Sequence, residues 1–170
     1  MKRTIIAILS VILAVSCTKE DRNNTIVNQE ESIDKYINSL QGIRVSRNGG
    51  ANRLVYTEGF GTDSLAVGDS IKFYYAGYIF SNGKGTLFAT NKPEIAQSKE
   101  FPLSGNIEKR VLRSGEFING LAKGLEGAKA GEKCDIVFSA KYGFNNTVVY
   151  NVPKLSPLIF EVWIEEIVKN

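Results

Sequence analysis

The reactive side chains exclude most enzyme chemistries. The 170-residue sequence has no histidine, which removes every mechanism that needs imidazole as a base, nucleophile or metal ligand. Two cysteines are too few for a disulfide-dense scaffold or a cysteine-only zinc site. No phosphate-binding glycine loop and no calcium loop of clustered acids occurs. A concentration of aromatic side chains remains, namely Tyr75, Phe88, Phe117, Tyr142, Phe144 and Phe160.

These aromatic residues admit two interpretations. Aromatic side chains are 10% of the sequence, and rings recurring on helices and strands are typical of a packed hydrophobic core. The same rings can also line an apolar pocket that binds a ligand. Periodicity alone leaves both interpretations open.

The element that would position these rings is one short helix. Phe117, Leu121 and Leu125 recur at i, i+4 and i+8, which gives a single apolar stripe. Gly120 and Gly124 lie inside the same helix, where each glycine costs about 1 kcal/mol relative to alanine. We therefore expect another element to pack closely against the backbone of this helix.

The rest of the chain predicts strands. Residues 70–80 alternate apolar and polar side chains and end at an Asn82-Gly83 turn. Residues 89–114 are polar and contain two prolines, so we expect an irregular insertion over one sheet edge. The other predicted strands are residues 43–45, 53–57, 133–140 and 158–168.

The N-terminus predicts an exported lipoprotein. Residues 1–16 begin with Lys2 and Arg3 and continue as an apolar run too short to span a bilayer, so we interpret them as a signal peptide. Residues 13–17 resemble a bacterial lipobox, which implies lipidation of Cys17. The alternative is a secreted protein in which Cys17 is buried or paired. Lys2 and Arg3 carry two of the three net positive charges, so no nucleic-acid partner is implied.

Between this signal and the folded domain we predict two segments. Residues 17–29 are polar and without periodicity, which predicts a flexible tether. Residues 30–42 place apolar side chains at i, i+3, i+4 and i+7, which predicts an amphipathic helix. Its stripe packs either on its own domain or against a second copy, giving a homodimer. The stripe consists of Ile33, Tyr36, Ile37 and Leu40.

Several motifs then follow in order along residues 67–168. Val67 to Gly77, Asn82-Gly83 with Leu87-Phe88, and Phe117 to Gly131 are followed by Tyr142-Gly143, Val152-Pro153 and Leu158 to Val162. Together they resemble FKBP-type peptidyl-prolyl cis-trans isomerases. The resemblance implies an α+β fold over residues 43–170, with an antiparallel, strongly curved β-sheet wrapped around one short central helix and an N-terminal helix extension.

The resemblance also implies a function, which is isomerisation of prolyl peptide bonds in exported proteins. Rotation about a peptide C–N bond has a barrier of about 18–20 kcal/mol, set by amide resonance. The twisted amide loses that resonance and becomes less polar, so a dry aromatic pocket tolerates it better than water does. The partners implied are proline-containing polypeptides, and no cofactor or metal is needed.

The residues matching the family motifs carry the implied site. Catalytic roles fall to Tyr75, Phe88, Ile118 and Tyr142, with the Ile118 backbone N–H holding a substrate carbonyl. The remaining substrate-binding positions are Phe117, Leu121, Phe144, Val152 and Phe160. Tyr142 and Phe144 compete for the position of the hydroxyl-donating tyrosine.

Two residues depart from the family pattern. Ala89 follows Phe88 where the family commonly has aspartate, and Leu121 stands where active members often carry an aromatic residue. Both changes favour an alternative, a catalytically weak or inactive peptide-binding or chaperone lipoprotein. A third hypothesis is a glycan-binding surface made by Tyr74, Tyr78 and Tyr150.

The resemblance and the lipobox together predict a cellular location. Lys19, Glu20 and Asp21 resemble the charged tags of lipoproteins in the Bacteroides group. We therefore expect a protein of the bacterial cell envelope that is lipid-anchored to the outer membrane through Cys17, on its periplasmic or surface face.

Overall fold

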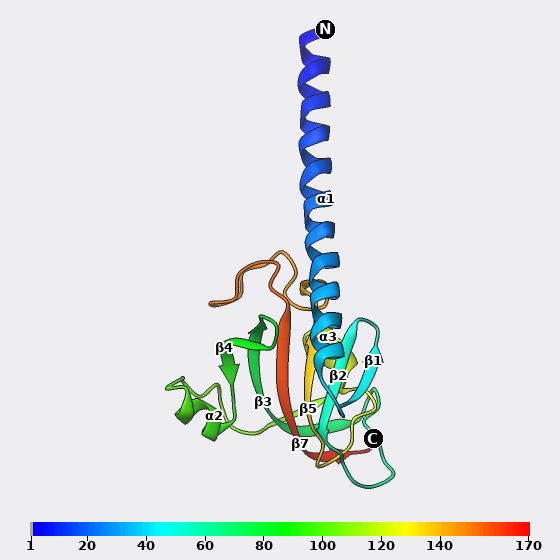
Figure 1. Cartoon of the computed structure of the whole chain (residues 1–170), viewed down its shortest axis with the longest axis vertical. Helices are drawn as coiled ribbons and strands as arrows, with labels where there is room; N and C mark the ends of the chain where they lie inside the picture. Colours follow the sequence, from blue (N-terminus) through cyan, green and yellow to red (C-terminus); the bar gives the residue numbers. More distant parts are fainter. Residues whose placement is uncertain (1) are drawn as a thin grey trace.

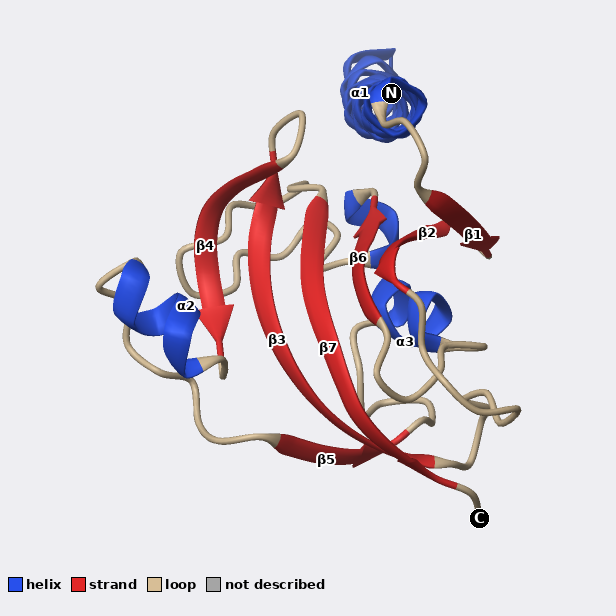
Figure 2. Cartoon of the chain, turned by 60° about the horizontal axis from the view of Figure 1, so that its bottom comes forward, coloured by secondary structure: helices blue, strands red, loops and turns tan. Residues whose placement is uncertain are grey.

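A curved antiparallel sheet dominates the protein. The computed structural model describes the backbone of residues 2–170 and the side chains of residues 19–170. In this part of the chain, seven strands form one sheet in the order β1-β2-β6-β7-β3-β4, and β5 pairs with β3 beyond the end of β4 (Figure 2). The strands are β1 (Arg44–Asn48), β2 (Ala51–Thr57), β3 (Ser70–Phe80), β4 (Lys84–Thr90), β5 (Glu108–Val111), β6 (Lys133–Phe138) and β7 (Leu158–Val168).

The helices lie against this sheet, and the predicted fold class is confirmed. They are α1 (Lys2–Ser39), α2 (Pro93–Ser98), α3 (Asn119–Leu125) and the 3₁₀ helix η1 (Ala140–Tyr142). The short central helix is α3, and the N-terminal extension is α1, which rises from the domain as a long rod (Figure 1).

The helix α3 approaches the sheet as closely as its glycines predict. A Cβ atom added at Gly120 would lie 2.3 Å from Cγ of Phe138, and one added at Gly124 would lie 2.2 Å from Cγ2 of Ile136. Real Cβ atoms do not approach other atoms so closely. The two glycines therefore let β6 side chains touch the helix backbone.

A buried arginine caps the C-terminal end of α3. The Arg53 side chain is 4% exposed, and its Nη1 donates to the carbonyl oxygens of Gly124 and Glu126 at 2.9 Å each. These carbonyls lack partners within the helix, because the last turn has no following N–H groups. Arg53 Nε lies 3.1 Å from the buried carboxylate of Glu132, which compensates the buried charge.

Both faces of the sheet carry a hydrophobic core, because side chains alternate along each strand. One core includes Leu121 and Leu125 of α3 with the side chains of Phe138 and Phe160. The opposite core is covered by α1, and its members from the sheet and the helix are Ile33, Ile37, Leu54, Ala76, Tyr78, Phe80, Val137 and Ile159.

The apolar stripe of α1 therefore packs on its own domain. Ile33 and Ile37 are both buried, and the rings of Tyr36 and Phe80 meet edge to face at 5.4 Å. Of the two interpretations left open by the sequence, this part of the helix adopts the intramolecular one.

The predicted flexible tether at residues 17–29 is wrong, because this segment continues α1 without a break. Gln29 explains part of the order: its side chain donates to the carbonyl of Leu155 at 2.7 Å and accepts from the N–H of Ala140 at 2.9 Å. A polar helix held by side-chain hydrogen bonds shows no apolar period, so the sequence pattern missed it. The amphipathic segment predicted as residues 30–42 ends its helix at Ser39.

The predicted irregular insertion at residues 89–114 is also partly wrong. It contains the end of β4, all of α2 and all of β5. The sequence did not predict β5, because four residues are too few to show the alternation typical of a strand. This strand forms by pairing with β3.

The predicted signal peptide and the lipidated Cys17 lie outside the described side chains. Among the described residues, no helix is both long and apolar enough to cross a membrane.

We predict that Gly124→Ala destabilises the protein, although alanine favours a helix. The added methyl group collides with Ile136, and overpacking of a core costs about 1–3 kcal/mol. This exceeds the gain of about 1 kcal/mol in helix propensity. Urea denaturation should show a lower midpoint at constant slope. Lys123→Ala, one position earlier, is the control and should change stability by less than about 0.5 kcal/mol; a stabilised Gly124→Ala variant would contradict the close packing.

Candidate active site

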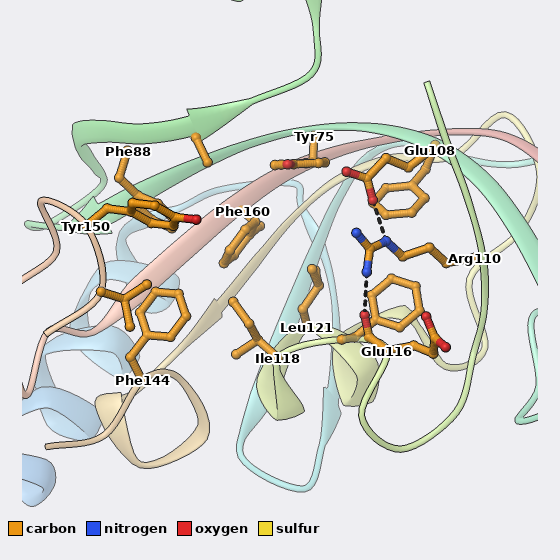
Figure 3. A pocket seen from close by; sticks show the side chains of 14 residues that line it. Tyr75, Phe88, Glu108, Arg110, Glu116, Ile118, Leu121, Phe144, Tyr150 and Phe160 are labelled. Atoms are coloured by element: carbon orange, nitrogen blue, oxygen red, sulfur yellow. Dashed lines mark hydrogen bonds and ion pairs between the residues drawn. The ribbon is translucent and has the colours of Figure 1, made fainter. Parts of the chain in front are cut away.

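A cavity of about 250 Å³ opens between α3 and the β3–β7 part of the sheet. Figure 3 shows aromatic rings along one side of it and a charged cluster at the other. Aliphatic or aromatic carbon makes most of its wall. The residues that line it are Phe73, Tyr75, Phe88, Ala89, Glu108, Arg110, Glu116, Phe117, Ile118, Leu121, Phe144, Val149, Tyr150 and Phe160.

Phe160 is the centre of the aromatic side. Its ring stacks on Phe138 at 6.0 Å, and Phe88 meets it edge to face at 5.6 Å. Tyr75 lies 6.3 Å from it on the neighbouring strand. Gly77 permits this packing, because a Cβ atom there would lie 2.7 Å from Phe88 and 2.9 Å from Phe160. The result is a wall of interlocked rings with defined positions.

The segment before α3 forms the opposite wall. Phe117 packs on Phe73 of β3 with ring centroids 5.7 Å apart. Ile118 follows and caps α3, and its backbone N–H donates to no group in the described part of the chain. Ile118 thus lines an apolar cavity.

The charged cluster lies at the far edge of the cavity. Arg110 Nε donates to the Glu108 carboxylate, and Arg110 Nη1 donates to the backbone carbonyl of Glu116 at 2.9 Å (Figure 3). Burial raises the pKa of Tyr75, and the neighbouring Glu108 carboxylate raises it further. Tyr75 is therefore a neutral phenol at physiological pH.

Most of the predicted site residues meet at this cavity. Two catalytic candidates from the sheet and one from the segment before α3 line it, together with four of the predicted substrate-binding residues. These are Tyr75, Phe88 and Ile118, and Phe117, Leu121, Phe144 and Phe160.

Tyr142 and Val152 do not line the cavity. The Tyr142 ring packs against Gly50, where an added Cβ atom would lie 2.1 Å from the ring, and it lines a separate cavity between α1 and the β1–β2 hairpin. The side chains of Tyr142 and Phe144 point in different directions, and Phe144 rather than Tyr142 lines the candidate active-site cavity. Val152 is fully buried in the core, and its bridge partner Val149 lines the cavity in its place.

Sequence reasoning missed several lining residues. Phe73 shares the alternation of Tyr75 and could have been found from it. Glu108 and Arg110 lie two apart on β5, a strand that was not predicted. Tyr150 is 94% exposed and has a positive φ of 50°, a loop conformation that the sequence does not reveal. The remaining lining residues are Ala89, Glu116 and Val149.

The hypothesis of a glycan-binding patch is wrong. Tyr78 is buried in the core beneath α1, while Tyr150 lines the cavity. The two rings therefore cannot share one flat exposed surface with Tyr74.

Comparison with known proteins agrees with this fold. The family model of FKBP-type peptidyl-prolyl cis-trans isomerase matches residues 61–165. FK506-binding protein 1 of Aspergillus oryzae is 31% identical over 117 residues, which are 66% of this chain and 94% of that protein. The chain therefore belongs to the FKBP-type peptidyl-prolyl cis-trans isomerase family, and its activity is that of a peptidyl-prolyl isomerase.

Solved structures of low identity share the fold. The three FKBP domains of wheat FKBP73 give a TM-score of 0.64 at 20% identity, covering 75% of this chain and only 52% of that chain. FkpA from Escherichia coli gives 0.61 at 18% identity, covering 96% and 71%. A peptidyl-prolyl isomerase of Pseudomonas syringae gives 0.63 at 15% identity, covering 86% and 96%.

We predict that Phe144, rather than Tyr142, contributes to activity. Phe144→Ala should lower kcat/KM for a Xaa-Pro peptide by roughly tenfold, since an aromatic contact is worth about 0.5–1.5 kcal/mol. Tyr142→Phe should leave kcat/KM within about twofold, because its hydroxyl lies outside the cavity. Both values are measured in a protease-coupled assay. If kcat/KM falls in Tyr142→Phe but not in Phe144→Ala, Tyr142 rather than Phe144 contributes to activity.

Proposed function

We propose that the cavity binds the proline of an exported polypeptide and lowers the barrier to rotation of the preceding amide bond. The observation that carries this is the aromatic wall of Tyr75, Phe88 and Phe160 facing Ile118 across an apolar cavity. A cavity of about 250 Å³ accommodates a pyrrolidine ring and its flanking amide.

The lining residues supply two effects in this proposal. Phe88, Phe144 and Phe160 exclude water, and a dry site favours the less polar twisted amide over the resonant planar one. The unpaired Ile118 N–H donates a hydrogen bond to a substrate carbonyl and fixes the peptide while the C–N bond turns. Leu121 forms the floor. No proton transfer is required, in keeping with a sequence without histidine.

A second function, peptide binding with weak or no catalysis, is favoured by one observation. Ala89 lines the cavity beside Phe88 and supplies no polar group to the wall. Such a protein would bind proline peptides and act as a chaperone without accelerating isomerisation.

We predict that Phe88→Ala abolishes most of the isomerase activity, because it removes one wall of the cavity. A protease-coupled assay on Xaa-Pro peptides should give kcat/KM at least about tenfold lower than that of the unmodified protein. Phe60→Ala is the matched control, since Phe60 is exposed outside the cavity.

The same assay separates the two functions. A rate equal to background with peptide binding retained would exclude catalysis and leave the binding function. FK506, from which the Aspergillus relative takes its name, should inhibit by competing for the cavity.

We further propose that the protein is a lipoprotein of the bacterial cell envelope. The support is the lipobox-like sequence ending at Cys17, after a charged and then apolar N-terminus. Lipidation would anchor the protein to the outer membrane on its periplasmic or surface face. The helix α1 would then hold the isomerase domain away from the lipid surface (Figure 1).

A homodimer through the N-terminal helix stays a prediction. Ile33 and Ile37 are occupied by the protein's own sheet. Any contact with a second copy would therefore involve α1 upstream of these residues, where Val27 is 52% exposed.

We predict that Cys17→Ser moves the protein from the membrane fraction to the soluble fraction of an expressing bacterium. Serine cannot carry the thioether of a lipoprotein anchor, and mass spectrometry of the N-terminal peptide should show no lipid. Cys134→Ala is the control and should remain membrane-bound, because Cys134 is buried and burial raises the pKa of its thiol. Membrane retention of an unlipidated Cys17→Ser protein would contradict the anchor.

A further inference from the structure

One guanidinium group joins the two walls of the cavity. Arg110 lies on β5, which pairs with β3 so that Phe73 stands opposite Glu108. From there Arg110 Nη1 reaches the carbonyl of Glu116, the residue that precedes Phe117 and Ile118. The contact ties the sheet side of the site to the segment that leads into α3.

The same guanidinium also holds a carboxylate beside Tyr75. Arg110 Nε donates to Glu108, so the two charges compensate each other, and Glu108 is only 21% exposed in its side chain. Figure 3 shows the Glu108 carboxylate beside Tyr75 on the cavity wall, where burial raises the pKa of Tyr75 and the negative charge of Glu108 raises it further. Tyr75 is one of the rings around Phe160.

No other charged pair among the described side chains joins the two walls of the cavity as Arg110 and Glu108 do. Arg113 binds the Glu116 carboxylate at 2.8 Å, but its side chain is 64% exposed and does not line the cavity. Ala89, on the other side of Phe88, provides no carboxylate. The Glu108–Arg110 pair is therefore the ionic pair that lines the cavity wall within the described side chains.

We propose that Arg110 and Glu108 are positioning residues for prolyl isomerisation, with Arg110 holding both the Glu108 carboxylate beside Tyr75 and the Phe117–Ile118 segment. The inference rests on the proposed function of the cavity. Neither residue donates or removes a proton. They set the distance between the ring wall and the Ile118 N–H, and a displacement of that kind costs rate more than affinity.

The planar fork of arginine suits this bridge. Its Nε and Nη1 point to two acceptors at once, Glu108 on the strand and the Glu116 carbonyl on the loop. Lysine keeps the charge but presents a single ammonium on a flexible stem, so it can hold either partner but not both in fixed geometry. Arg110→Lys therefore separates bridging from charge.

The test compares three variants of the full chain on one Xaa-Pro peptide. Arg110→Lys and Glu108→Gln should each lower kcat by roughly tenfold or more with KM changed by less than about threefold. Arg113→Ala, which removes the other arginine on Glu116, should keep the wild-type kcat. Thermal unfolding of all three should agree, which excludes loss of the fold as the cause.

A second readout follows Tyr75 itself. In ¹³C-labelled tyrosine spectra, with the Tyr75 signal assigned from Tyr75→Phe, the pKa of Tyr75 should fall in Glu108→Gln, because the carboxylate that raises it is gone, and stay unchanged in Arg113→Ala.

The outcomes distinguish this inference from the proposed function. If Phe88→Ala is inactive but Arg110→Lys and Glu108→Gln keep the wild-type kcat, the cavity is the site and the positioning role is overturned. If Phe88→Ala keeps full activity, the cavity is not the site and the proposed function itself fails.

Discussion

The contact between the backbone of α3 and the β6 strand is the constraint on which the rest depends. Gly120 and Gly124 have no side chains to hold Phe138 and Ile136 away, and the buried Arg53 guanidinium binds the carbonyls at the end of the helix. The short helix is thereby fixed in both height and direction above the sheet. A seven-residue helix has little stability of its own, so its position comes from these tertiary contacts.

That position creates the cavity. With α3 held against β6, the segment leading into it packs Phe117 on Phe73 of β3 and brings Ile118 to the cavity that Phe88 and Phe160 also line. The aromatic rings that line this cavity pack against one another and leave the cavity open. An apolar site of this kind fits a reaction whose transition state is less polar than its ground state, because the desolvation that would hinder a charged intermediate assists a twisted amide.

The opposite face of the sheet also carries a hydrophobic core, which α1 covers. Ile33 and Ile37 of α1 bury the side chains that alternate with those of the catalytic face, so the long helix is part of the domain's packing as well as an extension from it. Hydrogen bonds of Gln29 with Ala140 in η1 and with Leu155 in the loop after it continue that attachment beyond the apolar stripe.

The sequence by itself determined the alternation of β3, β6 and β7, the stripe and glycines of α3, and the ordered motifs of the family, because each rests on local periodicity or on residues close in the chain. Only the tertiary structure decided that Phe144 rather than Tyr142 faces the cavity, since side chains two apart diverge according to the turn between them. It also decided that β5 brings Glu108 and Arg110 to the wall: a four-residue strand has no period of its own and forms only by pairing with a strand distant in the sequence.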